Sequence, residues 1–192
     1  MKFSAVILVG GKSSRMGRDK AALQLGGQTL LQRQVEVVRQ LHPEVVYVSG
    51  GDCYGEQTEC QVLRDAFAGQ GPLAGIEAAL SVMTSPTLLV LAVDLPRMNL
   101  ATLRWLVDQC DGPDGVVPRL GKSTEPLAAL YPRAALDSLR VALKSGLNAA
   151  RDFARECVAA GWVCWADVPA DLHSAFTNCN SPEEWAALKA ND

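Results

Sequence analysis

A stretch near the start of the chain concentrates the kinds of residue that bind phosphate. It follows an apolar run and reads Leu8-Val9-Gly10-Gly11-Lys12-Ser13-Ser14-Arg15-Met16-Gly17-Arg18-Asp19-Lys20. Glycine lets the backbone approach a ligand closely and adopt a positive φ. Backbone amides, hydroxyls such as that of Ser13, and the fixed cations Arg15, Arg18 and Lys20 suit a polyphosphate. We predict a phosphate-binding loop; the structural alternative is a β-turn with a solvated basic tip.

Two widespread phosphate-binding motifs do not describe this loop. A Walker A loop that ended in Gly11-Lys12-Ser13 would need glycine at position 6, where this chain has Val6. A dinucleotide-binding fingerprint spaces its glycines as Gly-x-Gly-x-x-Gly, whereas here two are adjacent and the next is Gly17. The sequence therefore predicts a third kind of loop, which is longer and more basic.

A second candidate group is Asp94, which directly follows the apolar run at 87–93. Such a run is typical of a buried strand, and a similar run at 4–9 precedes the glycines. Because open α/β sheets bind ligands at the carboxyl ends of their strands, we expect Asp94 and the loop to share one edge. A carboxylate facing phosphate there favours a bound Mg²⁺. The alternative is an Asx turn before Pro96.

Three other segments could reach the same edge. Asp65 follows a short predicted strand and could contact a ligand or cap the next loop. The turn Gly71-Pro72-Leu73-Ala74-Gly75 precedes a predicted helix, whose N-terminus could receive a base or an anion; it is equally a plain helix start. Asn178 and Asn180 alternate on an extended segment and so face one side. Their amides could ligate Mg²⁺ or pair with a heterocycle.

The elements that must position these residues alternate between apolar and amphipathic stretches. This order predicts an α/β fold with a mainly parallel sheet flanked by helices on both faces. Strands are predicted at 4–9, 45–49, 61–64, 87–93, 115–118, 127–131, 162–168 and 175–177. Helices are predicted at 30–41, from just after Gly75 to about 83, and at 100–110, 133–144, 148–159 and 182–190. No linker or repeat interrupts the chain, so residues 1–192 are expected to form one domain.

Composition narrows the function classes. A net charge of −3 argues against a nucleic-acid or anionic-membrane surface. No segment approaches the roughly 20 apolar residues of a membrane span, so a cytoplasmic protein is expected. The six cysteines include no Cys-x-x-Cys pair, and the two histidines do not lie beside a cysteine at ligand spacing. Buried or half-buried thiols are expected rather than a zinc site or disulfides.

These motifs together resemble the molybdenum cofactor guanylyltransferases, the MobA family of the Rossmann-like nucleotidyltransferases. The resemblance covers almost the whole chain. It rests on the loop at 8–20, on Gly71-Pro72-Leu73-Ala74-Gly75, on Asp94-Leu95-Pro96, on Glu125-Pro126-Leu127-Ala128-Ala129-Leu130-Tyr131, and on Asn178-Cys179-Asn180-Ser181-Pro182-Glu183-Glu184. It implies transfer of GMP from GTP to the terminal phosphate of molybdopterin, with or without molybdenum, and release of pyrophosphate. Contacts with a molybdoenzyme or a cofactor chaperone are the protein partnerships that we consider.

The resemblance also implies roles for residues of this sequence. Nucleotide-binding roles fall on Leu8, Val9, Gly10, Gly11, Lys20, Ser49, Asp65 and Asp94, to which we add Ser13, Gly71, Pro72 and Leu73. Asp94 would also bind Mg²⁺, and Asn178 and Asn180 would lie near the acceptor. Val9 stands where the family usually has alanine, and Ser49 where it commonly has asparagine. Gly10-Gly11 favours guanine, because related cytidylyltransferases usually carry Ala-Gly there.

The expected mechanism needs no general base. A phosphate monoester has a second pKa near ~6 and is its own nucleophile at neutral pH. Catalysis would then be positioning and charge stabilisation, with Lys20 and Arg15 neutralising the departing pyrophosphate and Asp94 holding the metal. Two alternatives remain open. One is transfer from CTP or another nucleotide to molybdopterin or to a sugar or polyol phosphate, and the other is a catalytically silent nucleotide-binding protein.

Overall fold

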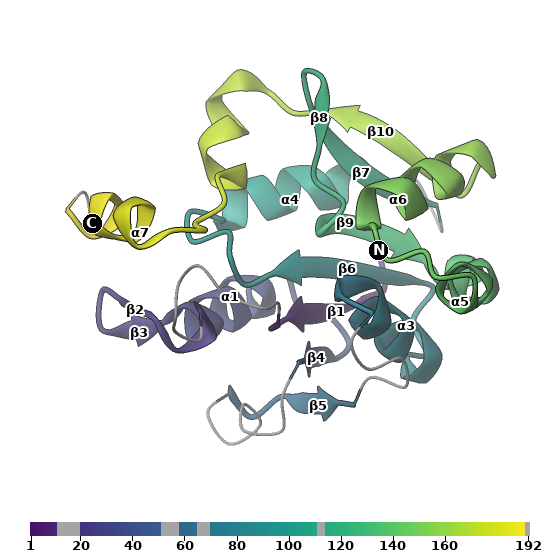
Figure 1. The fold of residues 1–192 in the computed structure, drawn as a ribbon, viewed down its shortest axis with the longest axis horizontal. Coiled ribbons are helices and arrows are strands. Elements are labelled where there is room, and N and C mark those ends of the chain that lie inside the picture. The colour runs from purple at the N-terminus through teal and green to yellow at the C-terminus, as the bar shows by residue number, and fades with distance from the viewer. Residues whose placement is uncertain (11–19, 51–57, 65–69, 111–113, 191–192) are drawn as a thin grey trace.

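The computed structural model describes residues 1–10, 20–50, 58–64, 70–110 and 114–190. A mixed sheet runs through it in the order β10-β7-β9-β6-β1-β4-β5, with β8 paired to β7 (Figure 1). Its strands are β1 (Phe3–Leu8), β4 (Val46–Ser49), β5 (Gln61–Leu63), β6 (Thr87–Ala92), β7 (Gly115–Leu120), β8 (Ser123–Thr124), β9 (Ala128–Pro132) and β10 (Val163–Asp167). A separate hairpin joins β2 (Gln24–Leu25) to β3 (Gln28–Thr29).

Helices cover both faces of this sheet. They are α1 (Leu30–Arg39), α3 (Pro72–Val82), α4 (Leu100–Asp108), α5 (Leu136–Lys144), α6 (Ala150–Ala159) and α7 (Pro182–Lys189), with 3-10 turns η1 (Lys20–Ala22), η3 (Arg133–Ala135) and η4 (Ala170–Phe176). One apolar cluster packs α1 and α4 against the sheet, and another packs α3, α5 and α6 against it. Every residue of β1 and β6 is buried, as expected for strands that are covered on both faces.

The alternation of side chains in β1 shows how one strand serves both layers. Ile7 and the following Val9 belong to the cluster beneath α1 and α4, whereas Val6 and Leu8 belong to the cluster beneath α3 and α5. Because successive side chains of a strand point to opposite faces, an unbroken apolar run satisfies both. The helices on the two faces thereby fix β1, and with it the position of the loop that follows.

The strand directions decide which edge collects the site. β1 pairs in parallel with β4 and with β6, and Leu8 is in register with both Ser49 and Ala92. The three strands therefore end at the same level of the sheet. In Figure 1 the arrowheads of β1 and β6 point to the side where α7 and the β2–β3 hairpin lie. β9 is antiparallel to β6 and so begins at this edge.

Several sequence expectations need correction. The strand predicted at 175–177 is absent: Ala175 and Phe176 close the 3-10 turn η4, which still buries both side chains in the core. A stretch this short carries too little periodicity to separate the two geometries. Helix α3 begins at Pro72, not after Gly75. Cys164 is exposed rather than buried.

Within the described residues, no helix has the length and apolarity needed to cross a bilayer.

Candidate functional site

Two glycines allow the backbone segments at the ends of β1 and β4 to lie close together. The Val9 amide donates to the Ser49 carbonyl at 2.7 Å, and Gly10 and Gly50 follow with φ of +155° and +129°. A Cβ on Gly50 would overlap the Val9 carbonyl oxygen, so only glycine fits there. Gly10 is exposed and a Cβ on it would lie 3.7 Å from the Gly50 Cα. This leaves an open stretch of backbone at the sheet edge.

Three polar side chains from distant parts of the chain meet beside this backbone. The Lys20 Nζ lies 3.4 Å from Asp94 Oδ2 and donates a 2.6 Å hydrogen bond to Asn180 Oδ1. The Lys20 side chain is 16% exposed and that of Asp94 is 28% exposed, so both remain accessible to a ligand. The sequence placed Lys20 and Asp94 at one edge, and the structure brings them together. We call Lys20, Asp94 and Asn180 the edge triad.

The segment that carries Asn178 and Asn180 is anchored to this edge. The Cys179 amide donates to the Asp94 carbonyl at 2.9 Å, which buries Cys179 and leaves Asn178 and Asn180 exposed on either side. The Asn180 amide donates to Glu184 Oε2 at 2.6 Å. The alternation predicted from the sequence is therefore present.

The start of α7 holds the same segment from the other side. Glu184 also accepts from the Ser181 amide, and its own amide donates to Ser181 Oγ, so the two residues form a capping box. The cap of α7 and the end of the site segment thus share the Glu184 carboxylate.

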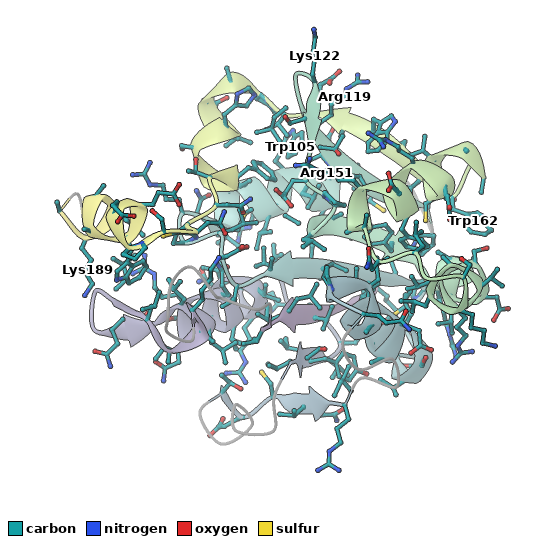
Figure 2. The ribbon with its side chains drawn as sticks, viewed as in Figure 1. Trp105, Arg119, Lys122, Arg151, Trp162 and Lys189 are labelled. Atoms are coloured by element: carbon teal, nitrogen blue, oxygen red, sulfur yellow. The ribbon has the colours of Figure 1, made fainter. Side chains whose placement is uncertain are left out.

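Sequence reasoning gave no site role to Glu125, which precedes β9 at the same edge. Burial raises its pKa above the usual glutamate value. The Leu127 amide opposes that rise, Asp94 adds to it through its negative charge, and Arg151 and an Asn178 hydrogen bond oppose it. Arg151 comes from the first turn of α6 (Figure 2). A strand running antiparallel to β6 must start where β6 ends, but the direction of β9 could not be read from its apolar run.

Four other residues predicted to contact the nucleotide have buried side chains. Leu8, Val9, Ser49 and Leu73 are buried, and the methyl groups of Val9 pack in the core. Any contact these four make with a ligand at the edge would therefore pass chiefly through main-chain atoms.

The turn before α3 lies close to this edge. Gly71 is the N-cap of α3, with φ of +70°, and Pro72 is the first helical residue. No side chain caps this end of the helix. A Cβ on Gly75 would come within 2.5 Å of Ser49 Oγ and 2.8 Å of Leu8 Cδ2. Glycine at position 75 thus lets the first turns of α3 pack directly on the ends of β1 and β4.

Four predicted site residues, Gly11, Ser13, Arg15 and Asp65, lie outside the described residues.

The polar groups at the edge match a hard divalent cation. Asp94 offers carboxylate oxygens and Asn180 an amide oxygen, which are ligand types that Mg²⁺ takes. Across the described ranges, no three His, Cys, Asp or Glu side chains gather as metal ligands. That is compatible with Mg²⁺, which commonly uses one or two carboxylates and completes its shell with water and phosphate.

Comparisons with known proteins agree on one family. The pattern of the MobA-like NTP transferase domain matches residues 5–160. A protein of Opitutus terrae named "Probable molybdenum cofactor guanylyltransferase" is 36% identical over 185 residues, covering 94% of this chain and 92% of that protein. The molybdenum cofactor guanylyltransferase of Xanthomonas euvesicatoria is 32% identical over 196 residues, covering 97% and 94%.

A solved structure shares the fold. Molybdopterin-guanine dinucleotide biosynthesis protein A from Archaeoglobus fulgidus superposes with a TM-score of 0.77 at 23% identity. The match covers 98% of this chain and 97% of that one.

Proposed function

This chain belongs to the MobA-like NTP transferase family, and from that membership and its edge triad we propose that it transfers GMP from GTP to the terminal phosphate of molybdopterin. The observation that carries the proposal is the meeting of Lys20, Asp94 and Asn180 beside a glycine backbone at the ends of β1 and β4. A cation, a carboxylate and an amide at one point suit a triphosphate on one side and an acceptor on the other.

Nucleotide binding is assigned to the loop after β1 and to the elements beside it. Gly10 offers exposed backbone to the base and ribose, and Lys20 offers its ammonium to the phosphates. The start of α3 at Gly71 and Pro72 adds the positive end of a helix dipole, which no side chain caps. The proposal also assigns Gly11, Ser13 and Arg15 to the phosphates and Asp65 to the nucleotide.

Nucleotidyltransferases generally use a divalent metal, and we propose Mg²⁺ here. The Asp94 carboxylate would hold the ion. The side-chain oxygen of Asn180 lies in the same edge triad, because Lys20 contacts both residues. When bound, Mg²⁺ supplies positive charge that stabilises the phosphate oxygens as charge develops on them.

The proposed reaction exchanges one phosphoanhydride bond for another. A terminal phosphate oxygen of molybdopterin attacks the α-phosphorus of GTP, and the bond from that phosphorus to the bridging oxygen of the β-phosphate breaks. Pyrophosphate leaves with the electron pair of that bond. Lys20 and Arg15 neutralise the charge that builds on it, while Asn178 and Asn180 orient the acceptor. The acceptor phosphate supplies the nucleophile, so no side chain needs to remove a proton.

Nucleotide choice and acceptor dependence test this function. We expect GTP with Mg²⁺ to raise the melting temperature more than CTP, ATP or UTP, since a ligand at 100 times its Kd adds about 2.7 kcal/mol. Pyrophosphate release should require GTP and molybdopterin together. A larger effect of CTP would make the protein a cytidylyltransferase, and binding without pyrophosphate release would make it a nucleotide-binding protein.

A further inference from the structure

The segment that carries Asn180 is attached through its backbone to two parts of the molecule. The Cys179 amide donates to the Asp94 carbonyl at 2.9 Å, and the next amide, that of Asn180, donates to Glu184 Oε2 at 2.6 Å. The first bond reaches the residue whose carboxylate belongs to the edge triad, and the second reaches the first turn of α7. Asn180 is therefore restrained on both sides, although the residue is exposed.

The carboxylate of Glu184 makes one hydrogen bond more than a helix cap requires. In a capping box the third helical residue accepts from the amide of the N-cap residue, here Ser181, and this bond is 3.2 Å long. The same oxygen accepts from the Asn180 amide, one residue before the cap, and at 2.6 Å that bond is the shorter of the two. Hydrogen bonds from an amide to an ionised carboxylate are stronger than those between neutral groups. The carboxylate thus holds the site segment as well as the helix.

The side chain of Asn180 carries this restraint to the edge triad. An ammonium can only donate, so the 2.6 Å bond from Lys20 Nζ requires the amide of Asn180 to turn its oxygen toward Lys20. The same ammonium lies 3.4 Å from Asp94 Oδ2. Polar contacts therefore connect Glu184 through Asn180 to Lys20 and Asp94.

We propose that Glu184 is a positioning residue, which fixes the backbone of Asn180 so that the side chain of Asn180 holds the Lys20 ammonium beside Asp94. This rests on the proposed function, in which Lys20 neutralises the departing pyrophosphate. The long stem of lysine is flexible, and an ammonium that is already in place needs no reorganisation when charge develops on the leaving group. Glu184 acts through Asn180 and does not itself contact either substrate.

The capping box supplies a matched pair of variants that separates positioning from helix capping. Glu184→Ala removes the bond to the Asn180 amide together with the cap, whereas Ser181→Ala breaks the cap and leaves the Glu184–Asn180 bond in place. We expect Glu184→Ala to lower kcat about 10-fold, the size of effect that one hydrogen bond to a charged group produces. Ser181→Ala should stay within about twofold of the wild type. Glu183→Ala removes the other carboxylate of the same helical turn and should also leave kcat unchanged.

Two further variants measure whether Glu184 acts through Asn180. Glu184→Gln keeps a side-chain oxygen that can accept from the Asn180 amide, so we expect it to restore kcat to within about threefold of the wild type. In Asn180→Ala the bond to Lys20 is already lost, so adding Glu184→Ala should slow transfer by less than about twofold more. Such non-additivity is expected of residues that belong to one hydrogen-bond network. A loss of helix α7 alone would not produce it.

The results separate this proposal from the proposed function. Equal losses in Ser181→Ala and Glu184→Ala, a normal kcat in Glu184→Ala, or losses that multiply in the double variant would overturn the positioning role and leave guanylyl transfer intact. A wild-type protein that releases no pyrophosphate from GTP and molybdopterin would overturn both. Melting curves of every variant give the folded fraction by which kcat is corrected, so a loss of folded protein is not counted as a change at the site.

Discussion

Two charged clusters of this molecule differ in the length and burial of their ion pairs. Between α3 and α5, Arg140 Nε donates to Glu77 Oε1 at 2.8 Å, Arg140 Nη2 donates to Ser81 Oγ at 2.9 Å, and that hydroxyl donates to Glu77 at 2.8 Å. The Glu77 side chain is only 5% exposed. At the sheet edge, Lys20 stands 3.4 Å from Asp94 and bridges to Asn180.

The difference separates groups that hold the fold from groups that can serve a ligand. In the α3–α5 cluster the three side chains satisfy one another, and two of them come from consecutive turns of one helix. The edge triad joins residues 74 and 160 positions apart in sequence, and its ion pair is long. A long, partly exposed pair loses little when a phosphate or a metal ion replaces one partner, whereas a short buried pair would lose much.

Removal of the edge carboxylate should give the largest effect. We expect Asp94→Ala to lower turnover at least ~100-fold, because the carboxylate proposed to hold Mg²⁺, and with it the positive charge that stabilises the transition state, is lost. The variant should still melt cooperatively, since the Lys20–Asp94 pair is too long to hold the fold. The exposed Asp108→Ala of α4 is the control. Near-normal turnover of Asp94→Ala at saturating Mg²⁺ would remove Asp94 from the site.

Substitutions in the α3–α5 cluster should lower the stability of the protein and leave its turnover unchanged. Arg140→Leu leaves Glu77 buried without its cation, and we expect a loss of about 2 kcal/mol in the free energy of unfolding. Asp137→Ala, which removes a 3.9 Å pair with the same arginine at an almost fully exposed carboxylate, should cost less than about 0.5 kcal/mol. Urea unfolding measures both. A change in turnover per folded molecule would mean that this cluster is coupled to the edge.

Lys20 should affect nucleotide binding and transfer together. We expect Lys20→Ala to raise the Kd for GTP about 10-fold, through loss of a charge-assisted hydrogen bond to phosphate, and to slow transfer as well. Lys122→Ala is the control, because that side chain projects from the tip of the β7–β8 hairpin (Figure 2). If Lys20→Ala altered only the acceptor KM, the ammonium would belong to the acceptor side.

The smallest effect concerns the pH dependence of stability. Burial and the charge of Asp94 raise the pKa of Glu125, against the opposing influence of Arg151, Leu127 and Asn178. Because the folded pKa exceeds the unfolded one, ionised Glu125 costs stability, and the cost develops as the pH rises from the ordinary glutamate pKa of about 4.3 through the raised value. Glu125→Gln should therefore melt above the wild type at pH 8, and the difference should vanish near pH 4. Equal melting temperatures at both values would contradict this.

The sequence predicted much of this arrangement because its signals are local. The apolar runs of β1 and β6 are long enough to need burial on both faces, and the residue after each run must lie at the sheet edge. Such patterns do not require knowledge of distant contacts.

What escaped prediction depends on contacts between distant segments. Glu125 reaches the site only because β9 runs antiparallel to β6, and strand direction leaves no trace in an apolar run. Gly50 is required by the Val9 carbonyl across the β1–β4 pair, which no local pattern reveals. The β2–β3 hairpin is too short, with two residues in each strand, to show alternation.

The position of Lys20 has a thermodynamic consequence for the two substrates. One ammonium touches both the carboxylate assigned to the nucleotide half and the amide assigned to the acceptor half. A phosphate that attracts this ammonium changes the hydrogen bonding of Asn180, and hence the affinity of whatever binds there. Linkage is reciprocal, so the factor by which GTP alters the affinity for the acceptor must equal the factor by which the acceptor alters the affinity for GTP.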